Sequence, residues 1–128
     1  MPIRSMPMEA GTGLGADLAP IGPALGGGAL DEDQAGHLAG PFKALGDPVR
    51  LRLMSMIASA ADGEICVCDL SAEFPLTGPT ISHHLRILRE AGLVDCSRRG
   101  TWVYYRPVPA ALTRLAGVLD ARHTTVCP

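Results

Sequence analysis

A single amphipathic segment constrains the fold of this 128-residue sequence more than any other part of it. Over residues 77–91, Ile81, Leu85 and Leu88 recur at intervals of four and three, which places all three on one side of a helix. Pro79 suits the first turn of that helix, and a glycine follows its end. The pattern predicts a helix that packs through one narrow apolar stripe.

The opposite face of this predicted helix is polar and basic. Small hydroxyl side chains reach phosphates and base edges, and the Arg86 guanidinium can pair with guanine or with phosphate. A solvated helix face is the alternative interpretation when this helix is considered alone. His84 falls toward the apolar side and is expected to pack. The candidate DNA-contacting residues on the helix are Thr80, Ser82, His83, Arg86 and Arg89.

Two short strands are predicted directly after this helix, over residues 94–97 and 102–106. Arg98-Arg99-Gly100 is predicted to connect them, which makes the pair a β-hairpin. Arg98 and Arg99 at its tip are candidates for contacting the phosphates of a flanking DNA groove, although charged loop tips are also common elsewhere. The aromatic residues are expected to pack in the strands rather than to stack on bases: Trp102, Tyr104 and Tyr105.

Apolar periodicity predicts four further helices. Asp47-Pro48 is a typical cap and first-turn proline for one of them, whereas Pro41 is expected to kink or restart the helix before it. With the hairpin, the order of elements is α-α-α-α-β-β-α, a mostly helical α+β fold of the winged helix-turn-helix type. The helices outside residues 77–91 are predicted over residues 31–45, 48–60, 66–74 and 107–122.

The charge distribution favours a nucleic-acid partner although the net charge is −2. Residues 1–35 hold five acidic residues and one arginine, whereas residues 79–106 hold five arginines and two acidic residues. A basic strip on a nearly neutral chain is the electrostatic footprint of a DNA-binding protein. No cofactor is expected to be required for that binding.

The two ends of the chain differ from its middle. Residues 1–30 contain seven glycines and four prolines without sustained apolar periodicity, which predicts a disordered arm. Residues 31–122 are expected to form the folded domain, and residues 123–128 a C-terminal tail. Neither a membrane-spanning run nor a secretion signal is recognisable, so a cytoplasmic protein without a membrane partner is expected.

The four cysteines are expected to be reduced, since disulfides are rare in the cytoplasm. In the middle of a helix the side chains of Cys66 and Cys68 would diverge by about 200°. At the start of a helix the cap residue is not yet helical, so the two thiols can converge, and free backbone N–H groups favour the thiolate. Soft sulfur ligands select thiophilic ions. The pair is therefore a candidate site for a metal or metalloid.

Three runs of residues together resemble one protein family. They are Phe42-Lys43-Ala44-Leu45-Gly46-Asp47-Pro48-Val49-Arg50-Leu51, Pro79-Thr80-Ile81-Ser82-His83-His84-Leu85 and Glu90-Ala91-Gly92-Leu93. Over residues 35–120 the sequence is similar to the arsenical-resistance and metal-sensing repressor family (ArsR/SmtB). The resemblance implies a homodimeric winged-helix repressor of double-stranded operator DNA, whose first and last helices form the dimer interface. The apolar stripe of residues 112–119 has little else to pack against, which agrees with that interface.

The run from Glu64 to Leu70, with its Cys-Val-Cys core, resembles the inducer motif of the arsenic- and cadmium-responsive branch. This resemblance implies that Cys66 and Cys68 bind As(III) or Sb(III), with cadmium, lead or zinc as alternatives, and that the ion releases the DNA. Trivalent arsenic prefers three sulfurs, but Ser71 stands where the best-known relatives carry a third cysteine. Cys127 on the tail is a candidate third ligand, with an unremarkable terminal cysteine as the alternative. A two-thiol site would suit a monomethylated arsenical.

Four other residues receive a simpler interpretation. Cys96 on the first predicted strand is interpreted as a structural thiol. His37 and His123 lack the partners that a nitrogen-rich zinc site needs, so they are interpreted as solvated or capping residues. Gly78 stands where relatives often carry a polar residue, commonly Gln, so the operator preference of relatives does not carry over.

Three alternative functions stay open at this point. Cys66 and Cys68 could form a redox sensor in a repressor of the same fold. They could also form a thiol–disulfide catalyst, although no α/β scaffold with a cis-proline is suggested and no base lies nearby in the sequence. A winged helix that binds only proteins is the third alternative.

Overall fold

The structure is a computed structural model that describes residues 28–120, which form two compact units. One unit contains residues 28–38 and 110–120, and the other contains residues 39–109. Most of the predicted N-terminal arm and the whole predicted tail, with Cys127 and His123, lie outside the described residues. The thiol pair and the predicted DNA-contacting residues all belong to the second unit.

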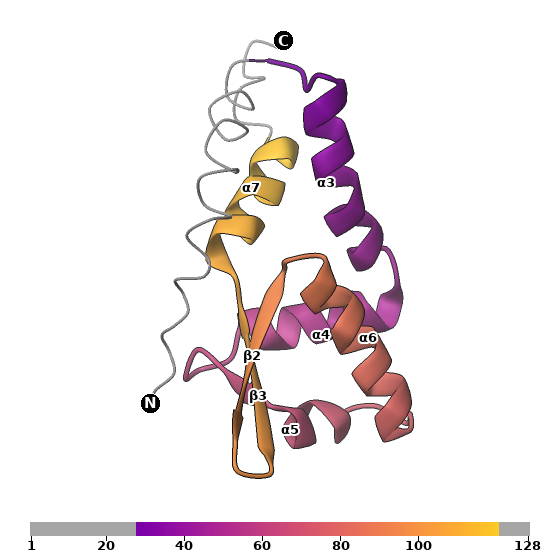
Figure 1. The fold of residues 1–128 in the computed structure, drawn as a ribbon, viewed down its shortest axis with the longest axis vertical. Helices are drawn as coiled ribbons and strands as arrows, with labels where there is room; N and C mark the ends of the chain where they lie inside the picture. The colour runs from indigo at the N-terminus through magenta and orange to yellow at the C-terminus, as the bar shows by residue number, and fades with distance from the viewer. Residues whose placement is uncertain (1–27, 121–128) are drawn as a thin grey trace, which may run out of the picture. The chain divides into compact units, whose positions relative to one another are not determined.

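The elements follow the predicted order with one addition (Figure 1). The predicted succession of four helices, a hairpin and a final helix is confirmed. The addition is a two-residue strand, β1, placed directly before the third described helix. In chain order the elements are α3 (Glu32–Leu45), α4 (Pro48–Ala58), β1 (Ile65–Cys66), α5 (Val67–Ser71), α6 (Gly78–Glu90), β2 (Val94–Arg99), β3 (Trp102–Pro107) and α7 (Pro109–Leu119).

The three strands form one antiparallel sheet in the order β1-β3-β2. Arg99 pairs with Trp102, so the turn consists of Gly100 and Thr101, with Gly100 at φ +65°. Glycine favours that left-handed conformation because it lacks a Cβ. The predicted connection Arg98-Arg99-Gly100 was therefore wrong, since both arginines belong to β2. We call the β2–β3 hairpin the wing.

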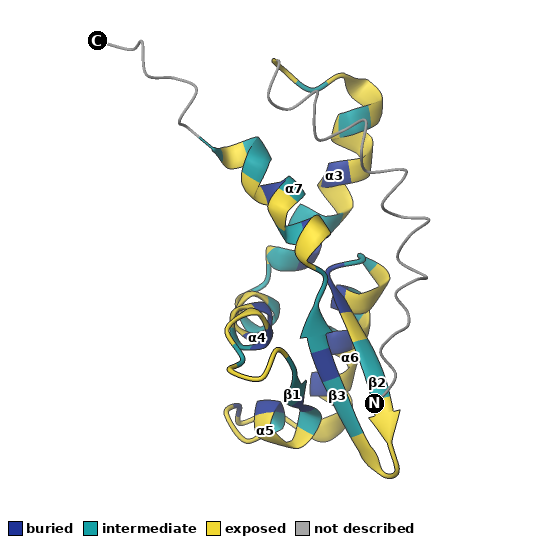
Figure 2. Ribbon diagram, turned by 90° about the vertical axis from the view of Figure 1, so that its left-hand side faces the viewer, coloured by how far each residue is buried: buried dark blue, intermediate teal, exposed yellow. Residues whose placement is uncertain are grey.

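The core of the second unit lies where α4, α6 and the sheet meet (Figure 2). The predicted apolar stripe of α6 is confirmed, because Ile81, Leu85 and Leu88 are each at most 1% exposed. Gly92 at φ +78° ends α6, as the sequence indicated. The other residues buried almost completely in this unit are Leu53, Ile57, Leu70, Leu93 and Val94.

The caps and prolines explain where the helices begin. Asp47 caps α4, since its carboxylate accepts hydrogen bonds from the backbone N–H groups of Val49 at 2.9 Å and Arg50 at 3.1 Å. The helix α3 runs through Pro41 without restarting, so that alternative was wrong. A proline removes only one helical hydrogen bond, and its fixed φ is itself close to the helical value.

The first unit contains α7 and the start of α3. Leu38, Ala111 and Leu115 are its buried apolar residues, whereas Leu119 at the end of α7 is 71% exposed. Two guanidinium nitrogens of Arg114 are buried without a hydrogen-bond partner among the described residues, and this burial lowers the pKa of Arg114. Between residues 28 and 120, no helix has both the length and the apolar character that a membrane crossing requires.

Candidate thiol site and nucleic-acid interface

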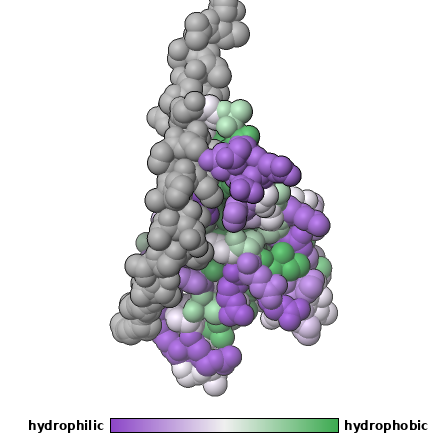
Figure 3. Space-filling view, turned by 45° about the horizontal axis from the view of Figure 1, so that its top comes forward, coloured by the Kyte–Doolittle hydropathy of each residue, from purple (hydrophilic) through white to green (hydrophobic). Residues whose placement is uncertain are grey.

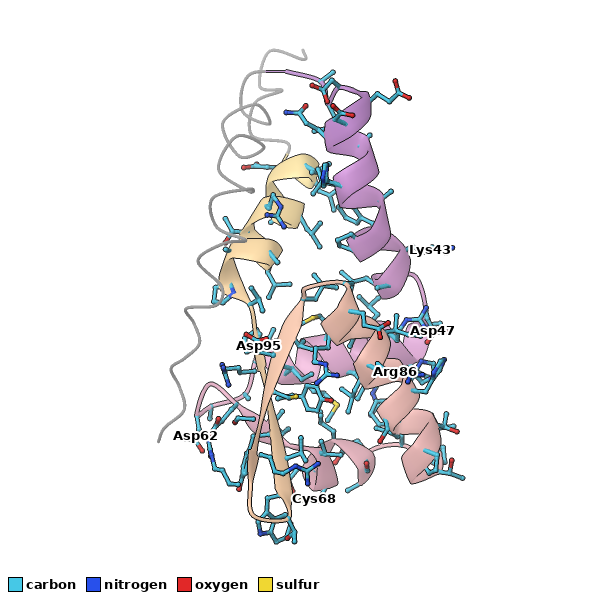
Figure 4. All side chains as sticks on the ribbon, in the orientation of Figure 1. Lys43, Asp47, Asp62, Cys68, Arg86 and Asp95 are labelled. Atoms are coloured by element: carbon cyan, nitrogen blue, oxygen red, sulfur yellow. The ribbon has the colours of Figure 1, made fainter. Side chains whose placement is uncertain are left out.

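The polar face of α6 is exposed over the whole predicted set of residues. Within the described chain, Arg86 makes no hydrogen bond or ion pair, and it lies midway along α6 (Figure 4). Arg89 is partly engaged, since its Nη1 donates to the sulfur of Cys96 at 3.2 Å. Figure 3 shows hydrophilic side chains over much of the visible surface. The exposed residues of this face are Thr80, Ser82, His83, Arg86 and Arg89.

His84 lies on the other side of α6 and joins it to α4. Arg50 Nη1 lies 3.2 Å from His84 Nδ1, and Arg50 Nε donates to the carbonyl oxygen of Ala44 at 2.6 Å. The expectation that His84 packs toward the protein is confirmed. The two helices are thus joined by polar contacts as well as by their apolar core.

The two arginines of the wing differ in their contacts, although both are exposed. Arg98 makes no hydrogen bond or ion pair within the described part of the chain. Arg99 places Nη1 2.7 Å from Glu64 Oε2 and Nη2 2.7 Å from Glu64 Oε1, which is a bidentate ion pair. The carboxylate of Glu64 raises the pKa of Arg99. The Arg99 guanidinium carbon also lies 4.4 Å from the centre of the Tyr104 ring.

Cys66 and Cys68 converge where β1 ends and α5 begins. Cys66 is the cap residue of α5, with an extended backbone at φ −72° and ψ 143°, and Cys68 lies in the first helical turn. The two sulfur atoms are 2.9 Å apart. The predicted convergence of thiols at a helix start is confirmed, and the extended cap is its cause.

The two thiols have different surroundings. Cys66 is buried, at 7% exposed, whereas Cys68 is exposed at the start of α5 (Figure 4). The pKa of Cys68 is raised, first by its hydrogen bond with Cys66, then by desolvation and by the charges of Cys66 and Asp69. The backbone N–H of Asp69 lowers the pKa of Cys68, as expected at a helix start, but the hydrogen bond with Cys66 outweighs it, so the net shift disfavours the thiolate. The proton on Cys68 must be displaced before a cation binds it.

The sulfur–sulfur distance tests how well the pair fits an ion. With metal–sulfur bonds of about 2.3 Å, two sulfurs on one ion lie about 3.3 Å apart at a right angle and about 3.8 Å apart at a tetrahedral angle. The observed separation is 2.9 Å. The pair therefore fits one thiophilic ion after an opening of about 0.4 to 0.9 Å.

Among residues 28–120, the other candidate ligands do not join this pair. No group of three or more His, Cys, Asp or Glu side chains in the described chain is arranged to hold a metal ion. Cys96 is opposite Tyr105, one row along the sheet from Cys66 opposite Tyr104, and successive rows face opposite sides. His37 Nδ1 contacts the carbonyl oxygen of Asp33 at 2.9 Å, as expected of a solvated helix residue.

The aromatic residues of the wing are not equivalent. Tyr105 is buried, at 8% exposed, which confirms its expected packing, and Tyr104 is half-buried beneath Arg99. Trp102 is 54% exposed beside the turn, so the expectation that it packs was wrong. The hairpin extends beyond the core at this point, so the described residues of the second unit cover less than half of Trp102.

The arrangement of α5, α6 and the wing defines the class of protein. A short helix is followed by a longer helix with an exposed polar and basic face, and a hairpin comes next in the chain. This is the helix-turn-helix with a wing that DNA-binding transcription regulators use. The exposed arginines of α6 and β2 supply the charge that contact with phosphates requires.

Comparison with known proteins places the chain within that class. Residues 47–95 match the family described as "Bacterial regulatory protein, arsR family". The chain is 43% identical, over 91 residues, to the arsenic resistance transcriptional regulator ArsR1 of Pseudomonas putida, covering 68% of this chain and 70% of that protein. The chain belongs to the ArsR family, whose members are transcription regulators and not enzymes.

Two further similarities support this assignment. The chain is 51% identical over 73 residues to a transcriptional repressor SmtB homologue of Synechocystis, covering 57% of this chain and 53% of that protein. A crystal structure titled as a possible transcriptional regulator for arsenical resistance superposes with a TM-score of 0.56 and 34% identity, covering 68% of this chain and 93% of that one. The winged-helix fold expected from the sequence is thus confirmed.

Sequence reasoning missed two features of the site. The strand β1 has two residues, which is too short to show an alternating pattern. Glu64 received no role, because its partner Arg99 lies 35 positions further along the chain. An acidic residue two positions before a cysteine carries no recognisable local pattern, so only the fold could bring these groups together.

Proposed function

We propose that this chain represses transcription by binding operator DNA as a homodimer, and that arsenite or antimonite releases it by binding the thiolates of Cys66 and Cys68. The observation that carries this proposal is the 2.9 Å separation of the two sulfurs at the start of α5, the first helix of the helix-turn-helix. An ion bound there acts directly on the DNA-binding element.

The DNA contacts in this proposal come from α6 and the wing. Arg86 supplies a contact to guanine or phosphate in the major groove, and Arg98 supplies a phosphate contact beside it. Both guanidinium groups are exposed and unpaired among residues 28–120, so neither must break an internal ion pair to reach DNA. The hydroxyls of Thr80 and Ser82, the His83 ring and the remaining Arg89 donors complete the proposed surface.

The dimer in this proposal forms through α7 and the start of α3. Leu119 of α7 is 71% exposed, and two nitrogens of Arg114 are buried without a partner in the described chain. Covering exposed apolar surface with a second subunit is favourable, and the buried Arg114 nitrogens are stabilised where that subunit supplies hydrogen-bond acceptors for them. Two reading helices then meet half-sites about one turn of DNA apart.

Release follows from the change in the sulfur–sulfur distance. An ion that opens the pair by about 0.4 to 0.9 Å displaces the first turn of α5 with Cys68, and it also pulls on the segment of Cys66, which is buried and pairs with Tyr104. Since α5 leads into α6, this displacement changes the placement of the reading helices. A coupling of about 1–3 kcal/mol between the ion and the DNA is enough for release.

The third ligand and the identity of the ion are the finer parts of the proposal. Cys127 remains the candidate third sulfur for a trivalent metalloid, and it lies outside the described residues. Cadmium, lead or zinc are the alternative inducers. Oxidation of the Cys66–Cys68 pair is a second candidate mechanism of release, and the close approach of the two sulfurs at 2.9 Å favours it.

A titration of the protein–DNA complex distinguishes these inducers. The reduced full-length chain is bound to its upstream promoter DNA, and fluorescence anisotropy follows release by arsenite, antimonite, cadmium and zinc. Arsenite and antimonite are expected to release the DNA at lower concentrations than zinc. Release by peroxide in chelator-treated protein, without release by any ion, would replace the metalloid with a redox signal. No release by either would contradict the proposal.

A further inference from the structure

One arginine of the predicted DNA-contacting set, Arg99, forms an ion pair within the described part of the chain. Arg99 forms a bidentate ion pair with Glu64, with both N···O distances at 2.7 Å, and lies 4.4 Å over the Tyr104 ring. We call these three residues the clasp. Two parallel hydrogen bonds and the flat face of a ring hold a guanidinium in one orientation, which a single contact does not.

Two members of the clasp lie near Cys66 in the chain or in the sheet, and the third lies near the turn of the wing. Glu64 precedes Cys66 by two residues, and Tyr104 lies directly opposite Cys66 in the β1–β3 pairing. Arg99 stands at the end of β2, next to the turn of the wing. The clasp therefore joins the tip of the wing to the segment that carries the buried thiol.

The neighbouring Arg98 provides an internal comparison. It is exposed on the same strand and pairs in register with Val103, but makes no hydrogen bond or ion pair within residues 28–120. A phosphate approaching Arg99 would have to compete with the Glu64 carboxylate, whose negative charge already neutralises the guanidinium. A phosphate approaching Arg98 meets no such competitor.

We propose that the clasp transmits ion binding from the thiol pair to the wing, which makes Arg99 a positioning residue and leaves the phosphate contact to Arg98. This inference rests on the proposed function. Opening the sulfur pair moves the segment of Glu64 and Cys66 relative to β3, and the clasp carries that movement to the tip of the wing. Without the clasp, the ion still binds but disturbs the wing less.

The first test uses DNA alone and compares matched substitutions. Arg98→Gln is expected to weaken DNA binding by the dimer at least about tenfold and to reduce the slope of log K against log salt by about 1.8, the loss of one phosphate contact in each subunit. Arg99→Gln is expected to leave the affinity within about twofold of the wild type and the slope unchanged, and Glu64→Gln is expected not to weaken binding. If Arg99→Gln lowered affinity and slope as Arg98→Gln does, Arg99 would be a phosphate contact and the proposal would be overturned.

The second test measures the coupling between arsenite and DNA. The wild-type ratio of DNA affinities without and with arsenite is expected to lie in the range of about 5 to 150. Glu64→Gln, Arg99→Gln and the double variant are each expected to lower this ratio at least about threefold, by similar amounts, because each breaks the same link. The swapped variant Glu64→Arg/Arg99→Glu restores an ion pair. Its ratio of DNA affinities is expected to rise part of the way back to the wild-type value.

Trp102 supplies a readout that requires no DNA. It is the only tryptophan in the sequence, is 54% exposed, and pairs in register with Arg99. Arsenite is expected to shift its emission in the wild type and to shift it less in Glu64→Gln, with unchanged ion affinity. If Glu64→Gln and Arg99→Gln each kept the wild-type affinity ratio and the wild-type emission shift, the proposed role of the clasp would be overturned. A wild type that binds arsenite without losing DNA affinity would instead overturn the proposed function, and the DNA test would still decide the role of Arg99.

Discussion

The two helices of the helix-turn-helix are built very differently. The helix α6 has 13 residues, a Thr77 cap that accepts from Thr80 N at 3.3 Å, and three fully buried apolar side chains. The helix α5 has five residues, a Cys66 cap whose side chain makes no capping hydrogen bond to the helix backbone, and Leu70 as its buried residue. The reading surface thus lies on the well-anchored helix, and the thiols lie on the weakly anchored one.

This difference explains how a small ion can act on a DNA-binding domain. Segments with few buried contacts and poor caps open and shift at low cost, whereas a helix locked in the core does not. An opening of the sulfur pair by less than 1 Å is therefore expected to deform the start of α5 and leave α6 intact. The ion then changes the position of the reading helix without unfolding it.

The largest expected effect comes from removing the anchor of α6. Leu85→Ala is expected to lower the free energy of unfolding by about 2–5 kcal/mol, because Leu85 is 1% exposed and its loss leaves a cavity. Leu51→Ala is the matched control, since Leu51 is 55% exposed, and about 0.5 kcal/mol or less is expected there. Urea denaturation measures both. Equal losses would mean that α6 is not anchored as described.

The next largest effect concerns Cys66 and Cys68 at the start of α5. Two thiols that bind Cd²⁺ release their protons, so cadmium affinity is expected to rise by up to about 100-fold per pH unit below the raised pKa of Cys68. Neutral arsenous acid condenses with thiols and releases water rather than protons, so its affinity is expected to be nearly independent of pH in that range. Calorimetric titration in two buffers measures the protons released. A count near one proton for cadmium, instead of two, would show that one thiol is not a ligand.

A smaller effect separates two arginines of α6. Arg86→Ala is expected to weaken DNA binding about tenfold, because its guanidinium has no partner among the described residues. Arg89→Ala is expected to weaken it less, since Nη1 of Arg89 is held by the Cys96 sulfur at 3.2 Å. Anisotropy titrations at several salt concentrations give both values. The reverse order would mean that DNA contacts the end of α6 more than its middle.

The smallest effect concerns the cap of α4, on which α6 rests. The pKa of Asp47 is lowered, first by the backbone N–H of Arg50. A carboxyl with a lowered pKa stabilises the fold above its ordinary value of 3.8 and loses that contribution as the pH falls through the lower folded value. Asn can still cap the helix through its side-chain oxygen, so Asp47→Asn is expected to lower the melting temperature only slightly at neutral pH, with the difference from the wild type vanishing in acid. If the difference in melting temperature stayed constant down to strongly acidic pH, the charge of Asp47 would not be its cause.

How much of this could be read from the sequence also differs between the two helices. The stripe of Ile81, Leu85 and Leu88 repeats within one helix, so local periodicity predicted both its existence and its buried face. The extended cap at Cys66 could be argued from helix geometry, and the convergence of the sulfurs followed. The contact of Glu64 with Arg99 depends on the pairing of β1 with β3, which is set by the whole fold and leaves no local pattern.

The central claim is that the sulfurs of Cys66 and Cys68, at the start of the weakly anchored α5, control how tightly the strongly anchored α6 binds DNA. Its most direct test is DNA affinity with and without arsenite for the reduced wild type, the double variant Cys66→Ser/Cys68→Ser, and Cys96→Ser as the control thiol. Arsenite is expected to weaken DNA binding at least about fivefold in the wild type and the control, and to leave the double variant unchanged. A double variant that binds DNA normally and is released by arsenite like the wild type would contradict the claim.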